Sequence, residues 1–306
     1  MSSDFSFGSA YMKGRYMPVS EAAIPVLDAA YRRSDVTYDV VGVRDGAFFR
    51  LDDHINRFRA SLTRLRMTPV ETDDDIRVIL NRIVALSGLR NAYVSMECLR
   101  GAPPPGKTRH PSNCESYLCC IAIPWVSVAS DEMFRRGMHL IIPKVRRIPP
   151  DSFDPTVKNF LWGDFTQSLF EAEDAGADYA VLLDAEGNVT EGAGFNVMCI
   201  VDGTVVSPAH GALEGVTRAS VFELCEELGI PTEIRDISAD ELRNADEIFT
   251  CTTAGGIMPA SRIDGRILTN DAPGPISSQL RERFWSRRAE GWHATPVDYS
   301  VVAGSN

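Results

Sequence analysis

Lysine is the scarcest of the side chains in this sequence that can do covalent chemistry. Four of the 31 basic residues are lysines, namely Lys13, Lys107, Lys144 and Lys158. The others are arginines, which stay protonated and do not form imines with a carbonyl group. Lys158 precedes an apolar segment, and Val157 and Phe160 are expected to desolvate its amine partly. Desolvation lowers the pKa of a lysine, and the neutral amine is the form that attacks an aldehyde. Lys158 is therefore a candidate nucleophile, although on this segment alone a solvated surface lysine is the simpler interpretation.

Three later segments combine polar and small residues in a way that suits a flat, anionic ligand. Glu191 precedes a run of small residues and can pair with a protonated ring nitrogen. Gly215, followed by Val216 and Thr217, opens a helix whose amides, hydroxyl and positive end suit a phosphate. The turn 251–256 can donate further amides and hydroxyls to an anion. The alternatives are a polar hairpin end for Glu191 and an ordinary helix cap for Thr217.

Composition and charge exclude several classes of protein. The net charge of −11 argues against a general nucleic-acid binder, which would need to neutralise phosphates. No apolar run reaches the length of a membrane helix, and the first residues lack the apolar region of a secretory signal. Seven cysteines without a paired spacing indicate free thiols in a reducing cytoplasm. The cysteines, histidines and carboxylates predict no metal site.

The elements that must position these residues are a mixture of strands and helices. Val36–Val43 and Ala47–Arg50 predict a hairpin with its turn at 44–46. A helix follows, because apolar residues share one face over 51–65. The pattern predicts further helices over Asp73–Ser87, Asn159–Ala175 and Thr217–Leu228, and further strands over Ala92–Leu99, Ser116–Ile123, Met138–Ile142, Tyr179–Leu183, Asn196–Val201 and Glu247–Cys251.

The arrangement of these elements predicts an α+β protein of two domains. Strands cluster with helices but do not alternate strictly with them, which argues against a doubly wound sheet. The stretch from Pro124 to Ser130 lacks a regular pattern and is the expected interdomain connection. We therefore expect a small N-terminal domain over 1–124, a linker over 125–130 and a larger C-terminal domain over 131–306.

Taken together, the motifs resemble a known family. In order and spacing, Lys158, Thr190–Asn196, Gly215–Arg218 and Thr252–Gly255 are similar to the motifs of the fold-type IV pyridoxal-phosphate enzymes, the branched-chain-aminotransferase-like family. Phe49–Arg57 resembles the family segment whose final arginine binds the cofactor phosphate. The resemblance implies a small N-terminal α/β domain, a larger C-terminal domain with a β-barrel-like sheet and helices, and pyridoxal 5′-phosphate as cofactor.

The resemblance also implies a role for each matched residue. Lys158 holds the cofactor as a Schiff base and transfers the substrate proton, and Glu191 keeps the ring nitrogen protonated. The other residues expected to bind the cofactor are Arg57, Phe195, Asn196, Val216, Thr217, Thr252 and Thr253. The residues expected to bind substrate are Arg33, Tyr38, Val40, Tyr93, Lys107, Arg109, Trp162 and Ala254. For each aromatic residue among them, packing in the core is the alternative.

Within the family, the chain is most similar to the (R)-selective amine transaminases. The similarity lies in Arg33–Val40, Ile148–Pro150, Asp154–Asn159, Thr190–Asn196 and Glu247–Pro259. Branched-chain enzymes usually have Phe-Glu-Gly where this chain has Tyr38-Asp39-Val40, and the His-x-Arg-x-His carboxylate trap of bacillary D-amino-acid enzymes is missing. The resemblance implies ping-pong transamination between an (R)-configured primary amine and a keto acid such as pyruvate.

The loop from Gly101 to Pro111 departs from that pattern. The amine transaminases use a loop arginine to hold the keto-acid carboxylate, and its position falls here near Gly106 or Lys107. Lys107 or Arg109 must take over this role, and Arg109 is the better candidate because its planar group binds a carboxylate bidentately. Arg33 is the alternative. Since family members build each active site at a dimer interface, we expect a homodimer with Ala102–His110 near the partner's site.

Three rival functions remain open at this point. A pyridoxal-phosphate lyase of the aminodeoxychorismate-lyase kind would release a keto acid without consuming an amino acceptor. A D-amino-acid or branched-chain amino-acid aminotransferase would accept only acids. A small-ligand binding protein without enzymatic activity would lack the absorbance of the lysine-bound cofactor.

Overall fold

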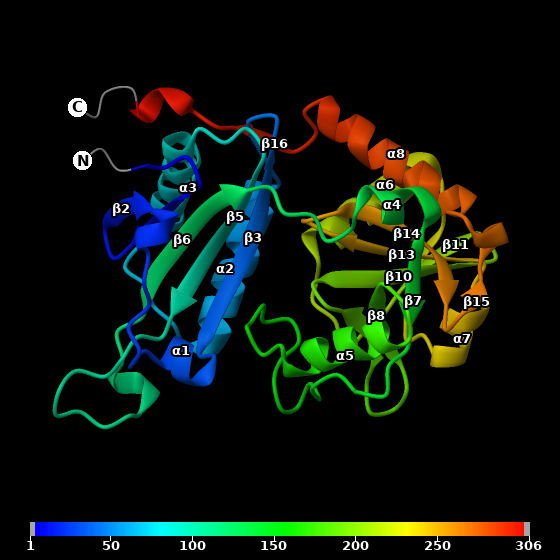
Figure 1. Cartoon of the computed structure of the whole chain (residues 1–306), viewed down its shortest axis with the longest axis horizontal. Helices are drawn as coiled ribbons and strands as arrows, with labels where there is room; N and C mark the ends of the chain where they lie inside the picture. Colours follow the sequence, from blue (N-terminus) through cyan, green and yellow to red (C-terminus); the bar gives the residue numbers. More distant parts are fainter. Residues whose placement is uncertain (1–3, 303–306) are drawn as a thin grey trace. The chain divides into compact units, whose positions relative to one another are not determined.

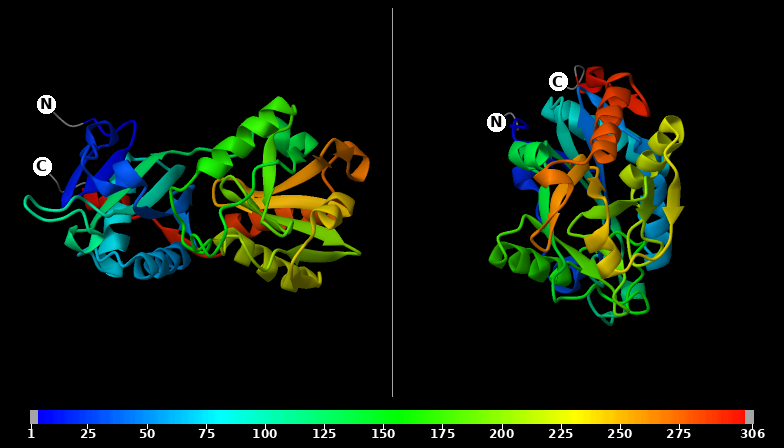
Figure 2. Two further views of the ribbon diagram at one scale, coloured as in Figure 1. Left: turned by 90° about the horizontal axis from the view of Figure 1, so that it is seen from below. Right: turned by 90° about the vertical axis from the view of Figure 1, so that its right-hand side faces the viewer.

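The computed structural model describes residues 4–302. The chain divides into two compact units, each with its own sheet and its own hydrophobic core (Figures 1 and 2). The first unit contains the described residues up to Val126, the short segment Val157–Phe160 and the described residues from Trp292 to 302. The second unit contains Ser127–Thr156 and Leu161–Gly291. None of the helices in the described part of the chain has the length and apolar character needed to cross a bilayer.

The first unit is built on a seven-stranded antiparallel sheet. Its strands, in spatial order, are β16 (Ala294–Pro296), β4 (Ala47–Phe49), β3 (Val36–Arg44), β5 (Ala92–Leu99), β6 (Tyr117–Pro124), β1 (Ser9–Met12) and β2 (Arg15–Pro18). The edge strand β16 comes from the C-terminal part of the chain. Because β16 pairs with β4, it ties the last described residues to the N-terminal unit.

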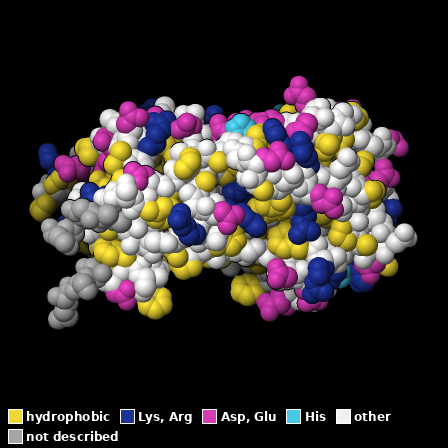
Figure 3. Space-filling model, turned by 90° about the horizontal axis from the view of Figure 1, so that it is seen from above, with side chains coloured by type: hydrophobic (Ala, Val, Ile, Leu, Met, Phe, Trp, Pro, Cys, Tyr) yellow, Lys and Arg dark blue, Asp and Glu magenta, His cyan; other side chains and the backbone are white. Residues whose placement is uncertain are grey.

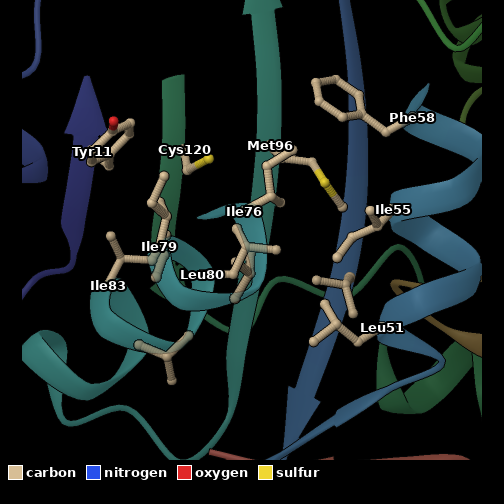
Figure 4. Close-up of a cluster of buried hydrophobic side chains, with 14 of the residues drawn as sticks. Tyr11, Leu51, Ile55, Phe58, Ile76, Ile79, Leu80, Ile83, Met96 and Cys120 are labelled. Carbon is tan, nitrogen blue, oxygen red and sulfur yellow. The ribbon is translucent and has the colours of Figure 1, made fainter. Parts of the chain in front are cut away.

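Two amphipathic helices cover one face of this sheet. They are α2 (Leu51–Leu65) and α3 (Asp73–Ser87), and a short helix α1 (Ala29–Arg33) precedes β3. A capping box between Thr72 and Asp75 begins α3, and Gly88 ends it in the left-handed conformation. In Figure 4 the apolar side chains of both helices point toward residues of the strands, such as Met96. Phe58 and Leu80 are fully buried there, and burial of each such side chain contributes about 1.5–3 kcal/mol to folding.

The second unit is built on a nine-stranded mixed sheet that closes on itself. Its strands are β12 (Thr232–Ile234), β11 (Thr204–Ser207), β10 (Phe195–Val201), β13 (Glu247–Thr252), β14 (Gly256–Ile263), β7 (Met138–Ile141), β8 (Tyr179–Leu183) and β9 (Val189–Gly192), with β15 (Arg266–Ile267) beside β14. Strand β9 pairs with β10 as well as with β8, so six of the strands form a closed ring. This closure makes the sheet barrel-like.

Helices flank the barrel-like sheet. They are α4 (Asp131–Arg136), α5 (Gly163–Asp174), α6 (Val216–Leu228), α7 (Ala239–Asn244) and α8 (Pro275–Ala289). Single-turn 3₁₀ helices lie at Val19–Glu21, Pro111–Asn113, Thr269–Asp271 and Tyr299–Val302. The combination of two sheets with helices agrees with the predicted α+β class.

One predicted element is wrong at its beginning. A helix was expected over Asn159–Ala175, but α5 begins at Gly163. Residues 158 and 159 instead pair with the first half of β3. The Tyr38 amide and the Thr37 hydroxyl both donate to the Lys158 carbonyl, at 3.2 and 2.6 Å, and Thr37 forms an isolated bridge with Asn159. These main-chain contacts hold the segment extended, which prevents it from joining the helix.

The same contacts change the domain assignment around Lys158. The boundary between Val126 and Ser127 falls within the expected linker 125–130. However, Val157–Phe160 and the chain from Trp292 onward belong to the first unit, whereas a contiguous domain over 131–306 was expected. The reason is strand pairing between residues far apart in the sequence, through Asn159 with β3 and through β16 with β4.

Candidate active site

Lys158 lies on the short segment that is pinned to β3. Its carbonyl accepts the two hydrogen bonds from residues 37 and 38, so the main chain at Lys158 is held in place. Its Nζ atom lies 4.5 Å from the centre of the Tyr38 ring. Val157 is buried, and Lys158 itself is half-buried. The amine therefore lies against an aromatic face, and both Lys158 and Tyr38 are among the residues expected at the site.

A buried cluster of charged and polar side chains lies on the opposite face of β3. The Asp39 carboxylate accepts hydrogen bonds from Arg57 Nε and Nη2, at 2.8 and 2.9 Å, in a bidentate pair. It also bonds to His54 Nδ1 at 2.8 Å. Asp39 and His54 are fully buried, and both His54 and Arg57 come from α2, one turn apart. The pairing fixes the direction of the Arg57 guanidinium, the group expected to bind a phosphate.

Electrostatics keep this cluster in one protonation state. Burial raises the pKa of Asp39, but the Arg57 charge and the His54 hydrogen bond outweigh it and hold the pKa well below its usual range. Burial lowers the pKa of His54, and the charges of Arg57 and Lys158 act in the same direction against the opposing effect of Asp39. Nε2 of His54 is buried and has no hydrogen-bond partner among the described residues, so a second ring proton would have no acceptor. The cluster therefore consists of a carboxylate, a neutral imidazole and a guanidinium.

The face of the sheet that carries Tyr38 holds the other proposed substrate residues of the first unit. Tyr38 and Val40 of β3 lie on it, and so does Tyr93 of β5, because alternate residues of these strands belong to the core on the other face. Sequence reasoning missed two further residues there, Ser95 and Glu97. Burial raises the pKa of Tyr93, and the nearby charges of Tyr38 and Glu97 raise it further.

The proposed cations of the first unit lie on the loop after β5 and on α1. Lys107 and Arg109 are exposed in the loop, and Arg33 is exposed at the end of α1. Arg33 Nη1 donates to the carbonyl of Arg109 at 3.4 Å, so the structure brings these two together. The glycines Gly101 and Gly106 have φ values of 77° and 82°, a conformation that favours glycine.

In the second unit, Glu191 is part of a buried ion cluster. Arg147 Nη1 bonds to Asp164 at 2.6 Å, and its Nε and Nη2 bond to Oε1 of Glu191 at 3.3 and 3.2 Å. The Leu213 amide donates to Oε2 of Glu191 at 3.1 Å. All three charged side chains are at most 8% exposed. Arg147 therefore stabilises Glu191 as a carboxylate, and neither Arg147 nor Asp164 was predicted.

The turns around Glu191 are connected to one another by side chains. Asn196 lies opposite Glu191 in the β9–β10 hairpin, and its amide group donates to the Leu213 carbonyl at 2.7 Å. The Thr252 hydroxyl donates to the Gly194 carbonyl at 2.7 Å. The Glu191 strand end, the start of α6 and the turn after β13 are thus brought together. Both Asn196 and Thr252 hold main chain in place, which is a more specific role than sequence reasoning assigned to them.

The other residues of the second unit that are expected to bind cofactor or substrate differ in burial and in contacts. Val216 and Thr217 are the first two residues of α6 and are buried. Thr253 and Ala254 are half-buried in the turn after β13, and the Ala254 carbonyl accepts from the Val128 amide at 3.0 Å. Trp162 precedes α5, and its ring lies against the Gly194 turn. The Phe195 ring is packed in the core against Tyr179, so the role proposed for Phe195 is left to its backbone.

Each unit, taken by itself, carries groups that suit a part of pyridoxal phosphate. In the second unit, the Glu191 carboxylate accepts N–H donors from Arg147 and from the Leu213 amide, and a protonated ring nitrogen is a donor of the same kind. At the start of α6 the main chain is tightly packed, since a Cβ on Gly215 would lie 1.9 Å from Oδ1 of Asn196. A glycine N-cap followed by helix amides is a typical phosphate site. The first unit supplies an amine at Lys158 and a fixed guanidinium at Arg57.

The missed residues differ in how well the sequence signalled them. Asp39 is a carboxylate in a strand whose other residues up to position 43 are nearly all apolar, and a buried charge there needs a partner. Glu97 is likewise a carboxylate within a largely apolar strand, β5. Arg147 and Asp164 lie in segments of mixed polarity and gave no such signal, because Arg147 pairs with Asp164 17 residues away and with Glu191 44 residues away.

Comparisons with known proteins identify the family of the chain. Residues 37–263 match the family model described as amino-transferase class IV. The chain is 31% identical over 278 residues to a putative branched-chain-amino-acid aminotransferase of Methanocaldococcus jannaschii, covering 90% of this chain and 94% of the relative. It is 27% identical to the D-alanine aminotransferase of Bacillus licheniformis, covering 88% of this chain and 93% of the relative.

A solved structure has the same fold. A branched-chain amino acid aminotransferase with pyridoxamine 5′-phosphate, from the source abbreviated T.th., superposes with a TM-score of 0.88 at 30% sequence identity, covering 96% of this chain and all of the other. The family match spans most of the chain and includes Lys158, Glu191 and both glycine turns. Class IV aminotransferases use pyridoxal phosphate, and the residues described above fit that cofactor. This chain belongs to the class IV aminotransferases and has the fold of the branched-chain aminotransferases.

Proposed function

We propose that this aminotransferase transfers the amino group of an (R)-configured primary amine to a keto acid such as pyruvate, by a ping-pong mechanism. Lys158 is the residue that bonds covalently to the cofactor. Arg57, Val216, Thr217 and Thr253 bind its phosphate, and Glu191 binds its ring nitrogen. The seven free thiols favour a reducing cytoplasm as the location.

The side chains around Tyr38 favour an amine over an amino acid as the donor substrate. On the sheet face next to Lys158, β3 and β5 present Tyr38, Val40, Tyr93, Ser95 and Glu97. None of these is a cation, and Glu97 is a carboxylate. An amino-acid substrate needs a positive group for its carboxylate, because an unpaired carboxylate in a largely apolar site is strongly disfavoured. Aromatic and aliphatic side chains suit the hydrocarbon part of an amine.

The chain's own residues divide the work of the reaction. When bound, pyridoxal phosphate supplies an electron-withdrawing ring that makes the substrate carbon acidic. The Lys158 amine takes the proton from that carbon and returns it on the other side of the transferred nitrogen. Its position against the Tyr38 ring restricts where that amine can reach. Arg147 keeps Glu191 ionised, so Glu191 retains the proton on the ring nitrogen.

The keto acid of the second half-reaction requires a cation from elsewhere. Arg109 is the proposed group, because its guanidinium binds a carboxylate bidentately and its loop has glycines at 101 and 106. Arg33 contacts the Arg109 main chain and is the second candidate. Lys107 is the third and offers only a point charge.

We expect the enzyme to be a homodimer. Val26, Leu27 and Tyr31 are each about 70% exposed in the segment that leads into and includes α1. Exposed apolar groups of this kind mark interaction surfaces. The Ala29 amide bonds to the Gly101 carbonyl, which connects this surface to the loop with Arg109. An interface there would place residues 102–110 near the partner.

The function is tested with an amine panel. Purified protein with pyridoxal phosphate is given (R)- or (S)-1-phenylethylamine and pyruvate, and alanine formation is followed. We expect alanine from the (R)-amine. A Lys158→Ala variant should lose both activity and the absorbance of the lysine-bound cofactor, while Lys144→Ala, which changes an exposed lysine, should retain both. Turnover of branched-chain or D-amino acids with no turnover of any amine would refute the proposal and favour the activity named for the relatives.

A further inference from the structure

Glu97 is a partly buried carboxylate without a cationic partner. It lies on β5, on the sheet face that carries Tyr38, and the Ser95 hydroxyl donates to its Oε1 at 2.9 Å. Among the described residues it forms no ion pair. Burial raises the pKa of Glu97, and the Ser95 hydrogen bond opposes this shift. The free-energy cost of burying this charge is therefore only partly offset within the chain.

The position of Glu97 relative to Lys158 follows from the strand register. In the antiparallel β3–β5 ladder, Glu97 is directly opposite Tyr38, and in the β5–β6 ladder it is opposite Cys119. The Cβ atoms of such pairs lie about 5 Å apart. Tyr38 is also the residue whose ring centre lies 4.5 Å from Nζ of Lys158. One aromatic side chain therefore neighbours both the reactive amine and the carboxylate of Glu97.

The groups that face Glu97 are neutral. Its cross-strand neighbours are a tyrosine and a cysteine, and burial raises the pKa of the Cys119 thiol to about 12, with the Glu97 charge adding to the effect. Burial also raises the pKa of Tyr93, which keeps that phenol protonated. A carboxylate in such surroundings attracts a cation strongly, because little water screens it and no arginine or lysine of the described residues 4–302 forms an ion pair with it.

On the basis of the proposed function, we propose that Glu97 determines substrate specificity by binding a second, protonated amino group on the amine donor. The preferred donor is then an aliphatic diamine, in which one amine would replace Lys158 on the cofactor and the other pairs with Glu97. The same carboxylate repels a donor that carries a carboxylate at that point. A charge-assisted hydrogen bond weakens when either partner loses its charge. Replacement of Glu97 by its neutral isostere glutamine should therefore remove the preference for diamines.

The test compares two donors of the same size, 1,4-diaminobutane and n-pentylamine, with pyruvate as acceptor. We expect wild-type protein to favour the diamine in kcat/KM, and Glu97→Gln to reduce this preference at least tenfold. Glu97→Gln keeps an acceptor for Ser95 and the same volume, so the fold is retained. Glu21→Gln, which changes an exposed glutamate of the same unit, should leave the preference unchanged.

A second readout does not depend on turnover. Borohydride reduction locks the cofactor onto the protein, and calorimetry then measures the binding of each donor without reaction. The diamine should bind more tightly than n-pentylamine to the reduced wild type, and this difference should vanish in Glu97→Gln. Equal preference in wild type and Glu97→Gln by both readouts, or no preference in wild type, overturns the role of Glu97. Turnover of amino acids but not of amines overturns the proposed function instead, and the calorimetry still decides the role of Glu97.

Discussion

Replacement of Arg147 by methionine tests whether the buried ion cluster holds the second unit together. The Arg147 side chain is 8% exposed and pairs with Asp164 and Glu191, whose side chains are 6% and 8% exposed. Methionine keeps the aliphatic contact with the Phe165 ring, over which the guanidinium now lies at 4.2 Å. The variant leaves two buried carboxylates near each other without a cation. Removal of one partner from a buried ion pair costs about 3–5 kcal/mol.

The expected result is a loss of thermal stability. For a unit of this size the cost corresponds to a fall in Tm of about 6 to 20 °C, measured by circular dichroism or calorimetry on the protein without added cofactor. Arg146→Met is the matched control, because Arg146 is the neighbouring arginine and is exposed. Its effect should stay within about 0.5 kcal/mol.

A charge-removal experiment separates the ion cluster from simple packing. Adding Asp164→Asn and Glu191→Gln to Arg147→Met removes both orphaned charges, so the triple variant should recover much of the lost stability. An Arg147→Met variant with the same Tm as the Arg146→Met control would refute this reasoning. So would a triple variant that is less stable than the single one.

Three further predictions concern the reaction and the first unit. Glu191→Gln should still bind the cofactor but slow the proton-transfer half-reaction on the order of 100-fold, and near-normal turnover would reduce Glu191 to a structural residue. Arg109→Ala should raise the KM for pyruvate without affecting the half-reaction with the amine, and an equal effect of Lys107→Ala would show a general loss of charge instead. The pKa of His54 is lowered on folding, so the unfolded state binds the extra proton first and stability falls as the pH drops below about 6.5. Urea unfolding between pH 7.5 and 5.5 should show this slope, at most about 1.4 kcal/mol per pH unit, and His54→Gln should lack that contribution; equal slopes would contradict it.

The charge distribution over the surface agrees with a small-molecule enzyme. On the face shown in Figure 3, basic and acidic side chains are interspersed and no broad field of one sign is visible. A nucleic-acid binder would need a continuous basic surface. This observation concerns that face, and it is in keeping with the net charge of −11.

Local patterns in the sequence determined much of the secondary structure. The helices α2 and α3 were predicted with their observed bounds, because their apolar spacing and end signals, such as Gly88, act over a few residues. The hairpin around 44–46 and the start of α6 after Gly215 are local in the same way. The family and its cofactor were implied by a resemblance, since the motifs around Lys158, Glu191 and Gly215 are similar in order and spacing to those of the fold-type IV enzymes.

Tertiary structure alone decided how those motifs are positioned and held. Lys158 joins the first unit because its carbonyl bonds to residues 37 and 38 of β3, about 120 residues away in sequence. Arg57 is paired with Asp39, and Glu191 with Arg147, through contacts that no periodicity encodes. Glu97 faces Tyr38 only because β3 and β5 adopt one particular register. Strand register and long-range ion pairs depend on which segments meet on folding, and a pattern that extends over a few residues carries no information about that.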